Sequence, residues 1–335
     1  METLSNIGLR ETTLTSSAAD TPHQVRHAAA EGLLDHEPFL QLTWGVLAIN
    51  FISVFIPFVG LIGAMISLWG YGIGATELVV MGVMYLVSGL GITVGYHRLF
   101  THRAFEATPA LQAVLAISGA TAVQGPLLQW VAVHRRHHRY SDHHGDPHSP
   151  KTLGSNVGAI MRGFWHAHLG WLFVRNVPDL AGYVKDLRRN PLLMQIDRLF
   201  VVWVALGLLI PAALGGWLTG TYAGAIRGFL WGGLVRVLLV SHVTWSINSV
   251  CHLWGSRPYP TRDLSRNNVL FGWLGLGEGW HNNHHAYPTS ARHGLKWWQF
   301  DVSYLLIRAC EKLGWAWNVH GPEIVVDSGQ PHPAD

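Results

Sequence analysis

Four long apolar runs, each with at most one charged residue, limit most strongly what this chain can fold into. They cover about residues 42–68, 78–96, 199–218 and 230–251. A helix that crosses a bilayer needs about 20 mostly apolar residues, so each run is a candidate span. Short turns join the first run to the second and the third to the fourth. The sequence therefore predicts an all-α integral membrane protein with four transmembrane helices in two hairpins.

Composition supports this class. The chain is 49% hydrophobic and only 13% charged, whereas roughly 25% of the residues in soluble domains are charged. Its 16 tryptophans suit the boundary between membrane and water. No run of basic residues interleaved with aromatics indicates nucleic acid, and neither a phosphate-binding Gly-rich loop nor a GxSxG nucleophile motif occurs.

A fifth charge-free run, residues 107–133, tests the topology. If it crossed the bilayer, the histidines on its two sides would lie on opposite faces of the membrane. It also contains residues that are unfavourable in hydrocarbon, namely Gly119, Gln124, Gly125, Pro126 and Gln129. We therefore expect it to form a helix that lies along the membrane surface or is buried in the protein.

The basic residues predict the orientation. Of the 23 Lys and Arg residues, 21 fall in the segments that this topology places on one side, which should be the cytoplasmic side. Both termini are then cytoplasmic, and the protein is a multi-pass protein of the cell membrane. Arg227 lies at the outer turn, and Arg236, inside the fourth run, is expected to extend towards the outer surface.

Neither the ends of the chain nor the two cysteines are candidates for catalysis or metal binding. Residues 1–38 are polar and lack the basic-then-apolar pattern of a signal peptide, so we expect a disordered arm. Residues 39–318 form one domain, and residues 319–335 form a C-terminal tail. Cys251 and Cys310 do not form a CxxC pair, and we expect both to be packing residues in a reducing environment.

Histidines are gathered in three short boxes, which are His97-Arg-Leu-Phe-Thr-His102, His134-Arg-Arg-His137-His138 and His281-Asn-Asn-His284-His285. On a helix, residues at i, i+3 and i+4 share a face, so each HxxHH box directs its imidazoles the same way. A loosened turn at the end of the second run could bring both histidines of the first box inward. The fourth run adds Asn248 and His252 at its cytoplasmic end. All these residues reach one level, the boundary between membrane and cytoplasm.

This concentration of imidazole predicts a metal site. Imidazole binds Fe, Zn, Cu and Ni in its neutral form. Nine histidines exceed the four ligands of a tetrahedral zinc ion but suit two ions with open positions for oxygen. A single histidine is more often a core or surface residue, but three boxes on one face favour metal binding.

Other polar residues near the boxes are expected to hydrogen-bond to the ligands rather than to bind metal themselves. The histidines of this kind are His143, His144, His148, His166 and His168, and the acids are Asp142, Asp146 and Glu278. Glu278 has an alternative role, which is to cap a helix that carries the third box.

The three boxes resemble those of membrane fatty acid desaturases, in the stearoyl-CoA desaturase-like Δ9 group. The resemblance covers about residues 40–318. It extends to Asp146-Pro-His148, Gly170-Trp-Leu-Phe-Val-Arg175, Thr244-Trp-Ser-Ile-Asn-Ser-Val-Cys-His252 and Gly277-Glu-Gly-Trp-His-Asn-Asn-His-His285.

This resemblance implies a cytoplasmic helical cap that holds two iron ions (Fe2+/Fe3+), with O2 as co-substrate. The implied ligands are His97, His102, His134, His137, His138, His252, His281, His284 and His285, with Asn248 reaching a metal through water. Gln124, Trp130 and Thr244 match the positions beside the bend of the acyl channel. Trp245 and Arg175 are further substrate-binding candidates. The implied reaction inserts a cis double bond between carbons 9 and 10 of a saturated acyl chain.

The sequence does not identify the molecule that carries the acyl chain. Where the animal enzymes have an Arg-Asp pair that contacts CoA, this chain has Ala132 and Val133, and the Lys expected after Arg175 is Asn176. The substrate is therefore an acyl chain on CoA, on a membrane lipid or on acyl carrier protein. No His-Pro-Gly-Gly haem signature occurs, so electrons should come from a separate ferredoxin or cytochrome b5-like donor with its reductase.

Two other activities compete with desaturation. An acyl hydroxylase of the same membrane di-iron superfamily would use the same oxidant to insert a hydroxyl group. A membrane metal transporter would place polar residues near the bilayer midplane, often in repeated helices. The histidines here lie at helix ends and in loops, and no internal repeat is evident.

Overall fold

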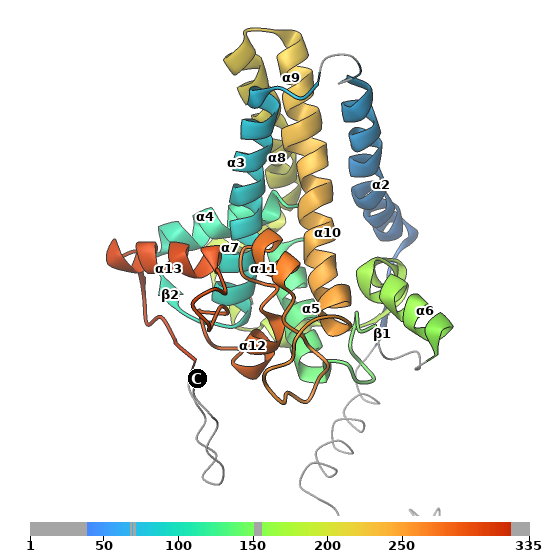
Figure 1. Cartoon of the computed structure of the whole chain (residues 1–335), viewed down its shortest axis with the longest axis vertical. Helices are drawn as coiled ribbons and strands as arrows, with labels where there is room; N and C mark the ends of the chain where they lie inside the picture. The colour runs from blue at the N-terminus through green and yellow to red at the C-terminus, as the bar shows by residue number, and fades with distance from the viewer. Residues whose placement is uncertain (1–38, 68, 70–71, 151–155, 323–335) are drawn as a thin grey trace, which may run out of the picture. The chain divides into compact units, whose positions relative to one another are not determined.

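The computed structural model describes residues 39–67, 69, 72–150 and 156–322. Within these residues, four helical segments are long and apolar enough to cross a membrane. They are α2 (Trp44–Ser67), α3 (Ala75–Leu90) continued by η1 (Gly91–Thr101), α8 (Phe200–Thr219), and α9 (Tyr222–Gly228) continued by η5 (Phe229–Val235), α10 (Arg236–Ser249) and η6 (Val250–His252). Figure 1 shows them alongside one another, with the shorter elements gathered at one end. The predicted arm, residues 1–38, lies outside the described residues, and the predicted tail is described only to residue 322.

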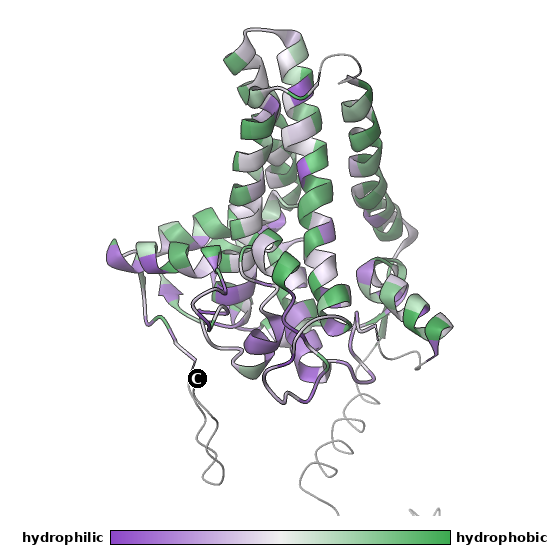
Figure 2. Ribbon diagram, in the orientation of Figure 1, coloured by the Kyte–Doolittle hydropathy of each residue, from purple (hydrophilic) through white to green (hydrophobic). Residues whose placement is uncertain are grey.

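Hydropathy divides the described residues in the same way. The long helices are mostly hydrophobic along their length, whereas hydrophilic residues concentrate among the short elements (Figure 2). The large apolar side chains of α2 and α8 are exposed, among them Phe51, Ile66, Val201 and Trp217. Exposed apolar surface of this extent on two helices fits contact with lipid rather than with water.

The second and fourth spans extend beyond the predicted runs at both ends, and they contain charged residues that are paired inside the protein. Glu77 is buried near the start of α3, and its carboxylate lies 3.7 Å from Nη1 of Arg227 on α9. Arg236 is fully buried and donates hydrogen bonds to the carbonyl oxygens of Gly232, Thr121 and Gly207. The expectation that Arg236 extends to the surface was therefore wrong, since backbone carbonyls take up its donors inside the bundle.

The fifth apolar run is not a single helix. It forms α4 (Pro109–Ala120) and the first part of α5 (Leu127–Tyr140). The backbone between them turns through Val123 and Gly125, which have φ values of 62° and 100°. Both helices are shorter than the roughly 20 residues that a span requires. Glycine lets α4 pack tightly on η1, because a Cβ atom at Gly91 would lie 2.1 Å from the backbone nitrogen of Gly119.

The remaining helices are short. They are α6 (Val157–His168), η2 (Gly170–Phe173), η3 (Ala181–Val184), η4 (Leu187–Arg189), α7 (Pro191–Arg198), α11 (Val269–Leu274), α12 (His281–Ala286) and α13 (Val302–Lys312). The strands form two small antiparallel pairs, β1 (Phe39–Gln41) with β3 (Asn176–Pro178) and β2 (Glu106–Ala107) with β4 (Ala316–Trp317). The described residues are therefore mostly helical, as predicted, and the largest buried cluster is centred on η1, α4 and α5.

Candidate metal centre

The two histidines of the first box are brought together by a π-helix. Residues 91–101 form η1, in which hydrogen bonds run from residue i+5 to residue i. The His102 amide donates to the His97 carbonyl at 3.1 Å, and the two imidazole rings lie 4.7 Å apart. In an α-helix, residues five apart point about 140° away from each other. The widened helix is therefore the loosened turn that the spacing of this box requires.

The other boxes lie on α5 and α12. On α5, His134 and His138 are four residues apart, and their Nε2 atoms lie 3.1 Å from each other. On α12, His284 Nε2 lies 3.0 Å from His138 Nε2 and 3.1 Å from His97 Nε2. The fourth span ends in a 3₁₀ turn that brings His252 Nε2 to 3.0 Å from His281 Nε2.

The nine histidines predicted as ligands fall into two groups of converging nitrogen atoms. One group holds five and the other holds four, and within each group the ligand atoms all lie within 4.8 Å of one another. The five-histidine group consists of His97, His102, His134, His138 and His284, and the four-histidine group of His137, His252, His281 and His285. Residues from η1, α5, η6 and α12 contribute, so segments far apart in the sequence build each group.

Carboxylates hold four of these rings in one tautomer. Asp146, Asp142 and Asp263 accept from the Nδ1 atoms of His137, His252 and His285 at 3.0, 2.7 and 2.8 Å. The carboxylate of Glu278 lies 2.5 Å from Nδ1 of His97. A neutral imidazole with hydrogen on Nδ1 has a lone pair on Nε2. These lone pairs point into the two groups, which is the arrangement that metal-binding histidines need.

Burial and mutual repulsion favour the neutral form of imidazoles that have no carboxylate partner. Burial, and then repulsion from neighbouring histidines, lowers the pKa values of His134, His138, His281 and His284 well below the ordinary value. Burial alone would raise the pKa of Asp146, but electrostatic attraction to His137 and a hydrogen bond from it hold that pKa at about 2. Neutral imidazoles beside ionised carboxylates form a donor set that fits a divalent metal ion.

Glu278 is a partner of a histidine and not a helix cap. Its carboxylate contacts His97 and accepts from Arg98, whose Nη2 lies 3.0 Å from Oε1. The helix with the third box begins after Trp280 and has no side-chain cap. The predicted partnership of Asp142 and Asp146 with histidines is confirmed by the distances above.

Sequence reasoning missed three residues beside the site. Asp263 lies in the irregular segment between η6 and α11, where its carboxylate contacts His285. His293 is buried, with its ring 4.4 Å from that of His284 and its Nδ1 atom 3.2 Å from Nη2 of Arg98. Arg98 also pairs with Asp301 at 3.0 Å. Arg98 directly follows the proposed ligand His97 in the first box. A positive charge so close to a metal site needs carboxylate partners, so the sequence could have indicated that Arg98 is paired.

The remaining candidate histidines lie outside both groups. His148 is buried, with Nδ1 3.8 Å from an oxygen of Asp146, and it stacks near His137. His166 contacts the carbonyl oxygen of Pro147 at 3.2 Å, and His168 contacts Ser249 and His242. His143 and His144 belong to neither group.

The three residues predicted beside an acyl channel form one hydrogen-bonded chain. Trp130 Nε1 donates to Gln124 Oε1 at 3.3 Å, and Gln124 Nε2 donates to Thr244 Oγ1 at 2.9 Å. Thr244 in turn donates to the carbonyl oxygen of Val240. Trp130 also stacks on His134, with a centroid distance of 5.0 Å, so the chain adjoins the five-histidine group.

The other substrate candidates lie nearby but in different surroundings. Trp245 is buried against His168 and His242. Arg175 lies over the Trp44 ring at 4.4 Å, next to the strand pair β1–β3. Asn248 lies on α10, but the 3₁₀ turn that follows changes the regular four-residue spacing to His252. Ala132 and Val133 lie on α5.

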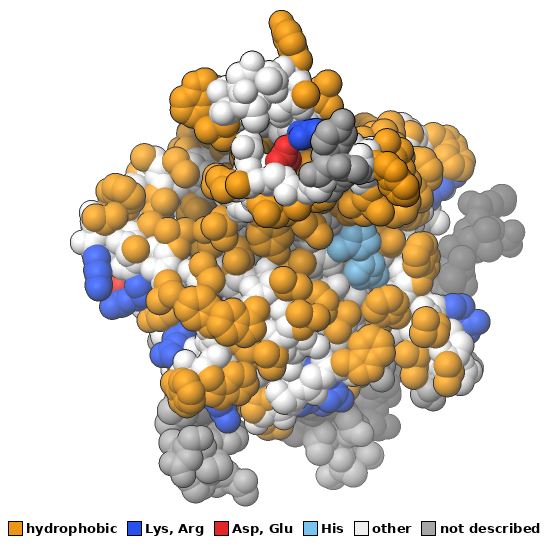
Figure 3. Space-filling model, turned by 45° about the horizontal axis from the view of Figure 1, so that its top comes forward, with side chains coloured by type: hydrophobic (Ala, Val, Ile, Leu, Met, Phe, Trp, Pro, Cys, Tyr) orange, Lys and Arg blue, Asp and Glu red, His pale blue; other side chains and the backbone are white. Residues whose placement is uncertain are grey.

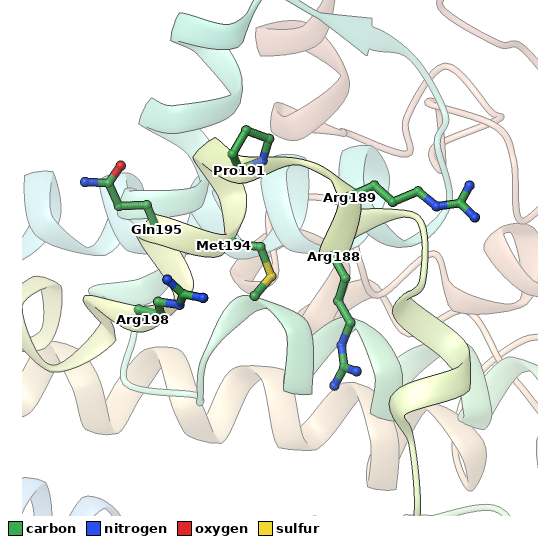
Figure 4. A pocket seen from close by; sticks show the side chains of 6 residues that line it. All are labelled: Arg188, Arg189, Pro191, Met194, Gln195 and Arg198. Carbon is green, nitrogen blue, oxygen red and sulfur yellow. The ribbon is translucent and has the colours of Figure 1, made fainter.

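A surface hollow of about 570 Å³ lies on another part of the molecule (Figure 4). Three arginines, Arg188, Arg189 and Arg198, line it together with Pro191, Met194 and Gln195. It contains neither imidazole nor carboxylate, so it lacks the ligands that an iron or zinc site needs.

Similarity to known proteins agrees with this site. A family model described as fatty acid desaturase matches residues 68–320. The chain is 46% identical to the hex-5-enoyl-[acyl-carrier protein] acetylenase of Moorena producens, over 80% of this chain and 84% of that protein. It is 40% identical to the sn-1 stearoyl-lipid 9-desaturase of Anabaena variabilis, over 70% of this chain and 80% of that protein. It is 38% identical to the acyl-CoA C20 Delta5-desaturase of Anemone leveillei, over 71% of this chain and 72% of that protein.

This chain belongs to the fatty acid desaturase family. It is an oxidoreductase that acts on fatty acyl chains, and the four apolar helices agree with a membrane protein. The relatives differ in the position they modify and in the acyl carrier, so family membership alone does not fix either for this chain.

Proposed function

We propose that this protein uses two iron ions to insert a cis double bond, at the Δ9 position, into a saturated acyl chain carried on CoA or on a membrane lipid. One observation carries the metal part of the proposal. Nine buried histidines converge in two groups, and carboxylates orient four of them with their lone pairs inward. One iron would be held by the five-histidine group and the other by the four-histidine group, with Asn248 reaching one of them through water.

The reaction removes two hydrogens from adjacent methylene groups. With O2, two electrons and two protons, it gives one carbon–carbon double bond and two water molecules. When bound, the irons supply the oxidising power for this chemistry. The chain's own residues hold the acyl chain, exclude water and keep the imidazoles neutral and oriented. The hydrogen-bonded chain of Gln124, Trp130 and Thr244 supports a bend beside the five-histidine group.

The same proposal includes the arrangement in the membrane. The four long helices form two hairpins, both termini are cytoplasmic, and the short elements form a cytoplasmic cap around the metal site within a domain of residues 39–318. This places the site on the side where a separate ferredoxin or cytochrome b5-like donor and its reductase can deliver electrons.

Expression in a host that makes no unsaturated fatty acids tests the activity. Lipid profiling should then show monounsaturated chains with a cis bond at carbon 9. Cells that express His284→Ala should lack them, because that variant loses a proposed ligand. A hydroxylated product would instead identify an acyl hydroxylase, and unchanged lipids in the presence of a competent electron donor would refute the proposal.

A further inference from the structure

A pair of histidines outside the metal groups joins α6 to the fourth span. His168 Nε2 lies 3.0 Å from His242 Nδ1, and His168 Nδ1 lies 3.0 Å from Ser249 Oγ. Both rings pack against Trp245, with centroid distances of 5.9 and 5.1 Å. Neither histidine belongs to a metal group, and neither contacts the hydrogen-bonded chain of Gln124, Trp130 and Thr244 in the described residues.

The hydrogen bonds assign a tautomer to each ring. The Ser249 hydroxyl donates to the Trp245 carbonyl at 2.8 Å, so its oxygen must accept from His168 Nδ1. Burial, and then repulsion from His242, lowers the pKa of His168 to about 4, so this imidazole is neutral at pH 7. A neutral ring with hydrogen on Nδ1 accepts at Nε2, and the donor there is His242 Nδ1.

His242 therefore has its hydrogen on Nδ1 and a lone pair on Nε2, since a second proton would place an unpaired charge in a partly buried site. Within the part of the chain that the structure describes, His242 Nε2 has no hydrogen-bond partner. The atom is a hydrogen-bond acceptor, so the group that it fits is a donor such as a hydroxyl.

The surroundings place this acceptor where lipid can reach it. Both histidines are only partly buried. One side of α6 exposes Val157, Met161 and Trp165, which recur at every fourth residue and form an apolar stripe. Figure 3 shows histidine side chains reaching the surface among hydrophobic ones. α2 adjoins this region, because its Asn50 side chain donates to the Leu172 carbonyl of η2 at 2.7 Å.

The acceptor lies on the same helical span as the proposed ligand His252. His242 precedes His252 by ten residues on a nearly continuous helix, which corresponds to about 15 Å along the axis. An acyl lipid held here by its polar part would have its chain within reach of the histidine groups.

We propose that His242, oriented by His168 and Ser249, binds a hydroxyl group of a membrane lipid that enters beside α6 and α10. This inference rests on the proposed function and refines it, since it selects a lipid with a hydroxyl-bearing headgroup as the acyl carrier. A glycerol hydroxyl and a sugar hydroxyl offer the same chemistry, and the test separates them.

The test measures which lipids remain bound to the purified, iron-loaded protein. Dipalmitoyl lipids are offered in pairs that differ in hydroxyl groups but not in net charge. Phosphatidylglycerol competes with phosphatidylmethanol, and monogalactosyldiacylglycerol competes with phosphatidylcholine. Native mass spectrometry reports the ratio of the two retained lipids.

We expect the wild type to retain at least one hydroxyl-bearing lipid about 3- to 10-fold over its partner, as one added hydrogen bond allows. A preference in the first pair identifies a glycerol hydroxyl, and one in the second pair identifies a sugar hydroxyl.

Variants assign the preference to His242. His242→Phe should retain both members of each pair equally, whereas His242→Gln, which keeps an acceptor, should retain part of the preference. Leu239→Phe is the matched control, because it enlarges an exposed residue of the same helix without changing a hydrogen bond.

Equal retention by the wild type overturns the inference, and so does a wild-type ratio in His242→Phe. Lipid retention does not depend on turnover. A lipid preference without a desaturated product would refute only the proposed activity, and a product without the preference would refute only this site.

Discussion

His102 lies one turn of a π-helix beyond His97, and its amide donates to the His97 carbonyl at 3.1 Å. This relationship explains how a box with five-residue spacing can join two boxes with α-helical spacing in one site. A π-helix inserted in an α-helix is rare and often marks a functional site. Here it brings both rings of the first box towards His134 and His284.

Loss of one histidine from either group should remove metal. We expect His137→Ala and His284→Ala each to abolish desaturation and to lower iron below two per chain, because the remaining ligands lose their arrangement. Iron analysis and product assays on purified protein measure both effects. His144→Ala, an exposed residue in neither group, should behave as wild type. Near-normal turnover with full iron in either ligand variant would contradict the assignment.

Removing a carboxylate partner should weaken metal binding without removing a ligand. Asp146→Asn loses the charge that stabilises the His137 Nδ1–H tautomer. We expect metal affinity to fall about 10- to 100-fold, as is usual for such partners. Competition with a chelator measures the change. Glu311→Gln, in the partly exposed Arg308–Glu311 pair on α13, is the control. An unchanged affinity in Asp146→Asn would show that the carboxylate does not support the metal.

Topology can be read with tags at four positions. Tags at residues 20, 180 and 330 should report the cytoplasm, and a tag at residue 73 should report the outer side. The physical reason is the shared site, since the residues before and after α4 and α5 must lie on one face of the membrane. An outer signal at residue 180 would contradict this arrangement. Accessibility labelling in intact and in opened cells provides the measurement.

Eight of the nine converging histidines could be found from the spacing of the three boxes, and His252 from its place at the end of the fourth apolar run. The four apolar segments could be found because lipid requires long apolar helices. The sequence did not reveal Asp263 or His293, which come next to His285 and His284 only through tertiary contacts. The burial of Arg236 was missed for a related reason. Its partners are backbone carbonyls of Thr121 and Gly207, and such partners leave no pattern in a sequence.

The position of the double bond should depend on the hydrogen bonds among Gln124, Trp130 and Thr244. Methylene groups along a chain differ little in reactivity, so geometry must select which pair reacts. Thr244 accepts from Gln124 at 2.9 Å, and Gln124 accepts from Trp130 at 3.3 Å. Thr244→Val keeps the shape of the side chain but leaves the Gln124 amide without this acceptor, and an unpaired buried polar group costs roughly 1–3 kcal/mol.

We expect the Thr244→Val variant to show slower turnover and a shifted or mixed double-bond position, measured by mass spectrometry of derivatised products. Thr219→Val, near the far end of α8, should give the native product at the native rate. If Thr244→Val and Gln124→Leu also do so, the bend that sets the position must be formed by other residues.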